Sequence, residues 1–197
     1  MNAMTWVLLA VGLLLLFWAV GAYNRLVRLK NAIANAFGHI DVQLKRRYDL
    51  IPNLVEVARK YLAHEAQTLE AVIAARNQAR SAEQRAAGSP LNAGALGALA
   101  GAEQLLGGAL GRLFAVAEAY PDLKADQTMR ELSEELASTE NRIGFARQAY
   151  NDHVLEFNDA AAQFPALIVA RLFNFQPQAM LESTASDTER AVVKVGF

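Results

Sequence analysis

Apolar residues form one unbroken stretch near the N-terminus, Met4–Ala22, and recur at helical spacing along most of the remaining chain. The stretch holds no charged side chain, and as a helix its nineteen residues extend roughly 28 Å, enough to cross the hydrocarbon core of a bilayer. Trp6 lies near one end of it and Trp18 and Tyr23 near the other, where amphipathic rings favour the headgroup layer. The pattern therefore predicts a transmembrane anchor over residues 1–22.

A cleaved signal peptide is the alternative interpretation of this stretch. Val20, Gly21 and Ala22 resemble a cleavage site, but the residues before the apolar run carry no Lys or Arg, and the run exceeds an ordinary signal core. A lipoprotein signal is excluded because the chain has no cysteine to acylate. A retained anchor is therefore favoured.

Positive charges collect directly after the anchor. Asp41 is the only acidic residue before Asp49, whereas the same region holds the basic residues Arg25, Arg28, Lys30, Lys45, Arg46 and Arg47. Lys and Arg beside a membrane helix favour the cytoplasmic side. The charges therefore predict a single pass with the N-terminus outside and the body in the cytoplasm.

After the anchor, apolar and aromatic residues follow one another in steps of three and four, at Leu26, Leu29, Ile33, Phe37, Ile40, Leu44, Tyr48, Ile51 and Val55. The steps repeat every eleven residues, which corresponds to about 3.67 residues per turn and a nearly straight stripe. Such a stripe is typical of one face of a bundle helix, or of a long helix packed against identical neighbours. On the second interpretation, the candidate contacts between copies are Leu26, Leu29, Ile33, Phe37 and Ile40, together with Gly108 and Gly111.

Prolines and small residues mark the predicted ends of the helices. Pro52 lacks a backbone N–H and its ring clashes with the carbonyl of Tyr48, so we expect a kink or a fresh start near Asp49. The helical pattern fades by Arg85, and residues 86–90, AAGSP, predict a turn.

The second half of the chain repeats this arrangement. Within a Gly- and Ala-rich run, leucines at helical spacing predict a helix from about Gly101. Tyr120 and Pro121 mark the next break, and a long helix is expected from there until Phe164 and Pro165 end it.

The segment that follows, ALIVARLFNF at residues 166–175, is apolar on nearly all sides and carries Arg171 as its single charge. As a helix of about ten residues it is too short to span a membrane. Leu172 and Phe173 are among the side chains that are too apolar to remain in water. We therefore expect the segment to dock on the bundle end, on lipid or on a neighbouring copy.

Two architectures satisfy these elements. Residues 24–86 and 101–163 are equal in length, and would pair as a hairpin of two kinked arms, each roughly 95 Å long as unbroken helix. If the chain instead reverses at the prolines, the same residues fold into a shorter bundle of three or four helices. Either way the chain is predicted to be all-α, with an anchor at 1–22, an antiparallel helical hairpin or bundle at 23–175 and a C-terminal tail at 176–197.

Composition and motifs argue against several function classes. The net charge is −1, whereas a nucleic-acid-binding protein shows a strong basic excess. The absence of cysteine removes disulfides, thiol nucleophiles and thiolate metal sites. His39, His64 and His153 lie in neither HExxH nor Glu-x-x-His, and the chain has no P-loop and no nucleophile elbow. We therefore predict a protein that is not an enzyme and uses no metal or cofactor.

Polar and aromatic residues that interrupt or flank the stripes are the remaining candidates for packing or interaction. They lie in the stretches RYDLIPNLV and ENRIGFARQAYN and comprise Arg47, Tyr48, Pro52, Asn53, Asn141, Arg147, Tyr150 and Asn151. We expect the asparagines to hydrogen-bond where helices meet and to set their register, rather than to bind a ligand.

Several motifs together resemble the LemA family: YNRLVRLKNAIANAF after the anchor, then RRYDLIPNLVEVARKY, AVAEAYPDLKA, ENRIGFARQAYND and FPALIVARLFNF. The resemblance covers the chain from Tyr23 to about Phe175. It implies a bacterial protein with one N-terminal membrane helix, a short extracytoplasmic N-terminus and a cytoplasmic antiparallel helical bundle at the inner membrane. It also implies relatives that are associated with magnetosome membranes or discussed alongside a membrane zinc protease. The chain departs from the family in residues 86–101, which are longer and more apolar than a plain helix connection.

Two function classes remain. In the first, the protein is a non-enzymatic scaffold that self-assembles and organises or curves the inner membrane, with lipid and further copies of itself as partners. In the second, it is an adaptor that presents its bundle to a membrane protease or a sensor protein. The anchor, the straight stripe and the lack of active-site motifs favour the scaffold.

Overall fold

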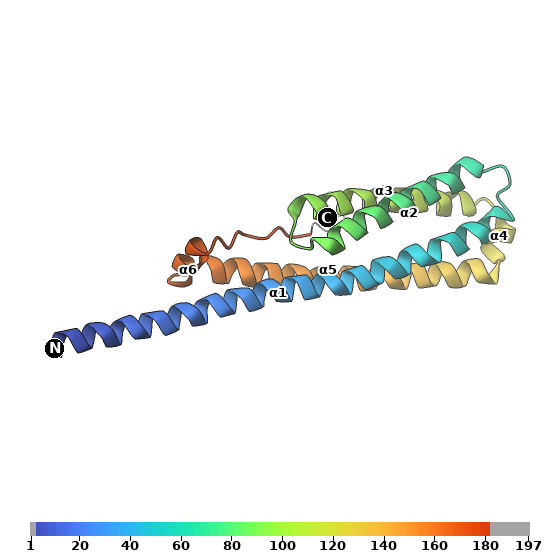
Figure 1. Cartoon of the computed structure of the whole chain (residues 1–197). Coiled ribbons are helices and arrows are strands. Elements are labelled where there is room, and N and C mark those ends of the chain that lie inside the picture. The colour runs from blue at the N-terminus through green and yellow to red at the C-terminus, as the bar shows by residue number, and fades with distance from the viewer. Residues whose placement is uncertain (1–2, 182–197) are drawn as a thin grey trace, which may run out of the picture.

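The computed structural model describes residues 3–181, and within that range its regular structure is entirely helical (Figure 1). In chain order the helices are α1 (Ala3–Arg59), α2 (Ala66–Gly88), α3 (Ala93–Ala117), α4 (Pro121–Ala125), α5 (Gln127–Ala162) and α6 (Ala166–Leu172). The all-α prediction is confirmed. Of the expected C-terminal tail, residues 182–197 lie outside the described range.

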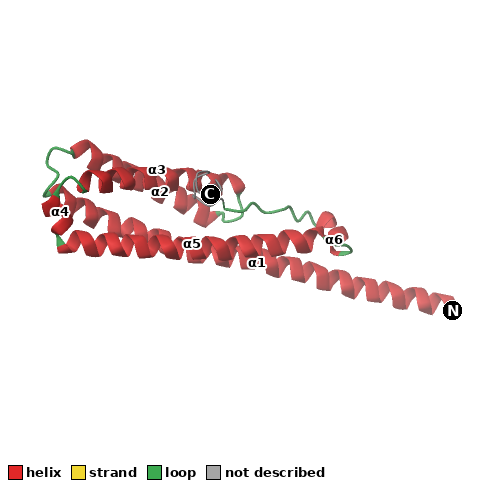
Figure 2. Ribbon diagram, turned by 180° about the vertical axis from the view of Figure 1, so that it is seen from behind, coloured by secondary structure: helices red, strands yellow, loops and turns green. Residues whose placement is uncertain are grey.

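Four of the helices form an antiparallel bundle. The part of α1 beyond the anchor packs along α5, and α2 and α3 form a hairpin that lies beside this pair (Figures 1 and 2). The chain first reverses at residues 60–65, where the buried side chain of Leu62 returns to the core. The two-arm hairpin is therefore wrong, because the expected outbound arm is divided between α1 and α2. The shorter antiparallel bundle is the architecture adopted.

The first part of α1 projects beyond the bundle and has no neighbouring helix (Figure 1). Its most apolar window has a mean hydropathy of 2.4, and none of that window is buried within the structure. Among residues 3–181, this is the one helix that is long and apolar enough to cross a membrane. A membrane would supply the apolar contacts that the bundle does not.

The apolar stripe of α1 lies inside the bundle. Leu26, Ile33, Phe37 and Ile40 are almost completely buried, and Leu29 is partly buried against the same core. Across the α1–α5 interface, the rings of Phe37 and Tyr150 meet edge to face with centroids 6.3 Å apart. The prediction that these α1 residues contact a second copy is therefore corrected, because helices of the same copy already cover them. Gly108 and Gly111, in contrast, are exposed on α3.

Pro52 does not interrupt α1, which runs through it without a break. The proline lies on an exposed face of the helix, so the predicted fresh start near Asp49 is wrong. Because proline has no N–H, the carbonyl of Tyr48 lacks its usual partner within the helix. Arg76 of α2 supplies the replacement, since its Nε donates to that carbonyl at 3.0 Å.

The breaks in the second half of the chain fall close to their predicted places. Helix α3 begins at Ala93, eight residues before the expected start at Gly101. The side chain of Asn92 caps it by accepting a hydrogen bond from the backbone N–H of Ala95 at 2.9 Å. Tyr120 precedes α4, whose first residue is Pro121, as expected of a proline at a helix start. Asp126 then separates α4 from α5 and caps α5.

Candidate functional site

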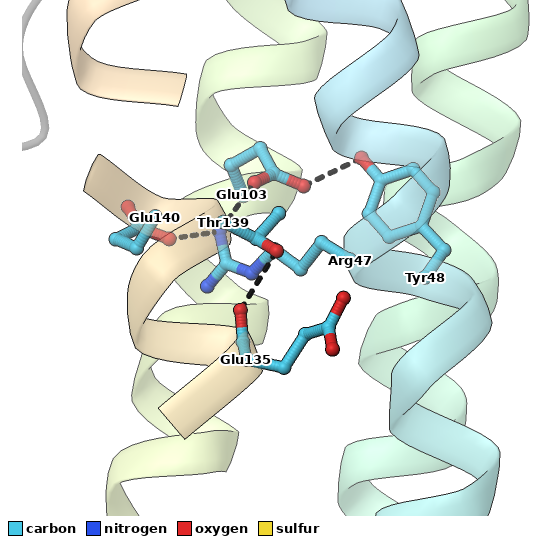
Figure 3. A network of polar contacts seen from close by, with 6 residues as sticks. All are labelled: Arg47, Tyr48, Glu103, Glu135, Thr139 and Glu140. Carbon is cyan, nitrogen blue, oxygen red and sulfur yellow. Dashed lines mark hydrogen bonds and ion pairs between the residues drawn. The ribbon is translucent and has the colours of Figure 1, made fainter. Parts of the chain in front are cut away.

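A network of charged side chains lies in the interior of the bundle, where α1, α3 and α5 meet (Figure 3). Arg47 of α1 is at its centre. Its Nη1 lies 2.8 Å from Oε2 of Glu103 on α3 and 2.8 Å from Oε2 of Glu140 on α5. Arg47 and Glu103 are both buried, whereas Glu140 is close to half exposed. One guanidinium thus connects three helices.

Tyr48 completes the buried part of this network. Its hydroxyl donates to Oε1 of Glu103 at 2.6 Å, so both oxygens of that carboxylate have partners. Burial, followed by the negative charge of Glu103, raises the pKa of the Tyr48 phenol far above its usual range. The phenol therefore remains protonated and acts as a permanent hydrogen-bond donor.

A second buried carboxyl group lies on α2. Glu83 is only 1% exposed, and no N–H or O–H group of the described residues lies within hydrogen-bonding distance of its carboxylate oxygens. The nearest cation is Lys45, whose Nζ lies 3.7 Å from Oε1 of Glu83. Burial, together with a hydrogen bond shared with Asp41 of α1, raises the pKa of Glu83 to about 7. Burial of Asp41 opposes its ionisation, but that shared bond and the ammonium of Lys45 at 2.6 Å outweigh it and lower the pKa of Asp41. A protonated Glu83 that donates to ionised Asp41 accounts for both shifts.

The geometry of these groups is that of a structural connection. The cavity beside Glu103, lined also by Leu99 and Arg147, has a volume of only about 10 Å³, which is at most the space of one water molecule. No group of three or more His, Asp or Glu side chains within residues 3–181 is arranged to hold a metal ion. The buried charges hold α1 to α2, α3 and α5 in one register.

Sequence reasoning identified Arg47 and Tyr48 but missed their partners. Glu103 is the one acidic residue in the Gly- and Ala-rich region of α3, and it falls in the buried stripe with Leu99 and Leu106. Glu83 interrupts the buried alanines of α2 in the same way. A single carboxylate on an apolar helix face indicates a buried polar contact, because such a group needs a partner on a neighbouring helix.

The predicted polar residues divide into two groups. Asn151 exchanges two hydrogen bonds with the backbone of Leu181, at 3.0 and 2.9 Å, and so attaches the chain after α6 to α5. Tyr150 is buried, and burial raises its pKa to about 12. Asn53 and Asn141 are exposed, so the expectation that they set the register between helices is wrong.

The end of the bundle beside the anchor is apolar and partly uncovered. Val169 and Ala170 of α6 are buried against α1 and α5, whereas Leu172 is 76% exposed and Phe173 54% exposed. The ring of Tyr23 on α1 still contacts Phe173, with centroids 4.8 Å apart.

The corner between α5 and α6 belongs to this same end. Phe164 and Pro165, which end the long helix as predicted, are both exposed there, and Phe164 is 81% exposed. One face of the 166–175 segment therefore docks on the bundle, and the opposite face remains open.

The sequence of this chain is similar to those of known proteins. The family model described as "LemA family" matches residues 36–197. Magnetosome protein MamQ of Magnetospirillum gryphiswaldense is 27% identical over 182 residues, which cover 84% of this chain and 67% of that relative. Magnetosome proteins MamQ 1 and MamQ 2 of Paramagnetospirillum magneticum are each 26% identical over 185 residues, with the same shares covered.

Proposed function

This chain belongs to the LemA family, and on that premise we propose that it is a non-enzymatic, membrane-anchored helical scaffold that self-assembles and organises or curves the bacterial inner membrane. The observation that carries the proposal is the continuity of α1. Its 57 residues contain both the exposed apolar segment and a central helix of the bundle, with no linker between them. The similarity to magnetosome proteins supports a place at a membrane.

Continuity of α1 has a mechanical consequence. A helix of 57 residues is roughly 85 Å long, of which roughly 28 Å is the apolar segment. The remaining length is held on one side by α5 and on another by α2. Such a unit transmits the direction of the anchor to the whole bundle, so contacts between bundles would set the spacing and tilt of the anchors.

The outward face of α3 supports self-association. Exposed glycines occur there at 97, 101, 108 and 111, and a Cβ atom at any of these positions would have no side chain and no other helix within 4 Å. Leu105 on the same helix is 56% exposed. Small residues on a helix face allow the backbone of another helix to approach closely. We propose that α3 contacts a second copy along this face, with Gly108 and Gly111 in the contact.

We also propose that the bundle lies in the cytoplasm. Arg25, Arg28 and Lys30 immediately follow the apolar segment, and Lys and Arg in this position favour the cytoplasmic side of a bacterial membrane.

Size-exclusion chromatography with light scattering, on the full-length protein in mild detergent and in nanodiscs, tests self-assembly. Wild type is expected to form particles larger than one copy. Gly108→Leu combined with Gly111→Leu should reduce the particle mass and leave helical circular dichroism unchanged, because both positions are open. Gly38→Leu combined with Gly144→Leu is the matched control, since these glycines are also exposed and open but lie on α1 and α5.

An adaptor for a membrane protease or signalling protein is the second candidate. Phe145, in the middle of α5, is 74% exposed, and an isolated aromatic side chain of this kind is able to anchor a partner protein. If wild type is monomeric in both mild detergent and nanodiscs, the scaffold proposal fails and the adaptor takes its place.

A further inference from the structure

An open cavity of about 340 Å³ lies where α1 leaves the bundle, between that helix and the corner formed by α5 and α6. From α1 it is lined by Trp18, Gly21 and Arg25, and from the opposite side by Gln163, Phe164 and Pro165. The volume is within the range of sites that take small molecules. The cavity is separate from the buried charge network, which lies deeper in the bundle.

The height of this cavity relative to the membrane follows from α1. The uncharged stretch ends at Ala22, and Arg25 lies about 4.5 Å farther along the helix axis. The headgroup layer adds roughly 5 to 8 Å on each side of the hydrocarbon core. If the uncharged stretch fills that core, Trp18 lies about 6 Å inside its edge, at the depth of the upper acyl chains, and Arg25 lies at the level of the lipid phosphates.

The lining chemistry matches this position. Arg25 is exposed and forms no ion pair with a carboxylate among the residues that the structure describes. A planar guanidinium binds phosphate oxygens in pairs, and the side-chain amide of Gln163 adds a donor. Phe164 and Trp18 offer apolar surface to a neighbouring ligand, since both are substantially exposed. No acidic residue lines the cavity.

We propose that this cavity binds a single phospholipid. Arg25 contacts the phosphate, and Trp18 and Phe164 contact the glycerol and the upper acyl chains. An anionic headgroup is preferred, because it brings no cation of its own to compete with Arg25. This inference rests on the proposed anchoring of α1 in a membrane, and is independent of whether the bundles self-assemble.

The exposed face of α6 continues the same lipid-facing surface. Ile168 and Leu172 are four residues apart, so they lie on one side of the helix, and both are more than half exposed. Figure 1 places α6 at the end of the bundle from which the anchor projects. The partner that covers this apolar face is therefore the bilayer surrounding the bound lipid.

Native mass spectrometry of the full-length protein tests the proposal directly. Phosphatidylglycerol is titrated into protein held in a neutral detergent, and the number of lipids bound to each copy is counted. Wild type is expected to bind one phosphatidylglycerol saturably, with weaker binding of phosphatidylcholine. Arg25→Gln should weaken binding at least tenfold, and Phe164→Ala should weaken it by a smaller factor. Arg28→Gln is the matched control, because Arg28 is also exposed on α1 but does not line the cavity.

Three results would overturn the lipid site. Equal weakening by Arg25→Gln and Arg28→Gln would show diffuse attraction to the basic segment. Displacement of the lipid by inorganic phosphate at a similar concentration would show an anion site without lipid recognition. A change in particle mass for Arg25→Gln, with an unchanged lipid count, would show that the cavity contacts a second copy.

Two further measurements separate this inference from the proposed function. Carbonate extraction of membranes reports whether wild type and Arg25→Gln remain anchored, whatever the lipid count. Light scattering on the same samples reports self-assembly. If wild type is monomeric but binds one lipid per copy, the scaffold proposal is wrong and the lipid site stands. If wild type is anchored and assembled but binds no lipid, the lipid site is wrong and the scaffold proposal stands.

Discussion

At the scale of single residues, this bundle is distinguished by charges placed on its apolar helix faces. Arg47, Glu103 and Glu83 are all buried. Arg47 and Glu103 form an ion pair, whereas burial and the neighbouring Asp41 raise the pKa of Glu83. Buried ion pairs add little net stability compared with apolar packing, but breaking one is costly because it strands the remaining charge. These residues therefore make the bundle sensitive to single substitutions and to pH.

Arg47→Met should lower the free energy of unfolding by about 3 kcal/mol, because it leaves the Glu103 carboxylate buried without its cation. Arg47→Met combined with Glu103→Leu should recover part of that loss, since no unpaired charge remains. Urea unfolding followed by circular dichroism measures both. Arg46→Met is the control, because Arg46 pairs with Glu135 on the surface, and it should change stability by less than about 1 kcal/mol. Equal losses for the two single variants would contradict the buried pairing.

Glu83 should make stability fall as pH rises from about 4.5 to about 7. The ordinary pKa of this carboxyl group is 4.5, and folding raises it to about 7. Below pH 4.5 the group is protonated in both states, whereas between the two values only the folded protein retains the proton. Unfolding is then favoured by up to about 1.4 kcal/mol per pH unit. The lowered pKa of Asp41 acts only in more acidic solution, below about pH 4.

Glu83→Gln tests this dependence, because the amide is still able to donate to Asp41 but does not titrate. The variant should equal or fall below wild type at pH 5 and exceed it at pH 8, when both are measured by urea unfolding. Glu134→Gln, which changes an exposed carboxylate on α5, should follow the wild-type curve. Parallel curves for wild type and Glu83→Gln between pH 5 and 8 would show that Glu83 is ionised in the folded protein.

At the scale of elements, the connection between α1 and α2 depends on a proline. Pro52 removes the donor that the Tyr48 carbonyl would otherwise have, and the guanidinium of Arg76 takes its place at 3.0 Å. A hydrogen bond from a charged donor to a carbonyl stabilises by about 1.5 to 3 kcal/mol. The proline thus turns an ordinary position within α1 into an attachment point for α2.

This dependence predicts a non-additive pair of substitutions. Arg76→Met should lower the free energy of unfolding by about 2 kcal/mol in wild type, because the Tyr48 carbonyl loses its donor. In a Pro52→Ala background the loss should be at least about 1 kcal/mol smaller, since the alanine N–H then serves that carbonyl. Unfolding in urea for the four proteins gives the coupling. An additive result would show that the Arg76 contact does not compensate for the proline.

At the scale of the whole molecule, one helix joins the membrane segment to the core. Arg25, Arg28 and Lys30 lie where α1 enters the bundle. The bundle therefore lies on the same side of the membrane as these basic residues. We expect an Asn2→Cys variant to react with a membrane-impermeant maleimide in intact cells, and Ser89→Cys to react only after lysis. Residue 2 lies outside the described range, and Ser89 is in the exposed turn after α2. The natural chain has no cysteine, so each label reports one position. Labelling of Ser89→Cys alone in intact cells would reverse the orientation.

Some features of the fold could be predicted from sequence, and others could not. The stripe from Leu26 to Val55 was correctly predicted to share one helix face, because spacing along a helix is a local property. The reversal at residues 60–65, KYLAHE, has neither Gly nor Pro, so it left no recognisable turn signal. Pro52, which did give a break signal, lies within a continuous helix because Arg76 compensates for it.

The sequence by itself determined the helical class, the membrane-length segment and the apolar faces, because each depends on residues within a few turns of one another. Tertiary structure alone decided which charges meet. Arg47 and Glu103 are 56 residues apart, and their contact requires α1, α2 and α3 to pack in one register. The cavity beside Arg25 likewise needs the end of α5, which is more than 130 residues away along the chain. The spacing of residues along one helix carries no information about such long-range contacts, since they depend on where the chain reverses and how far each helix extends.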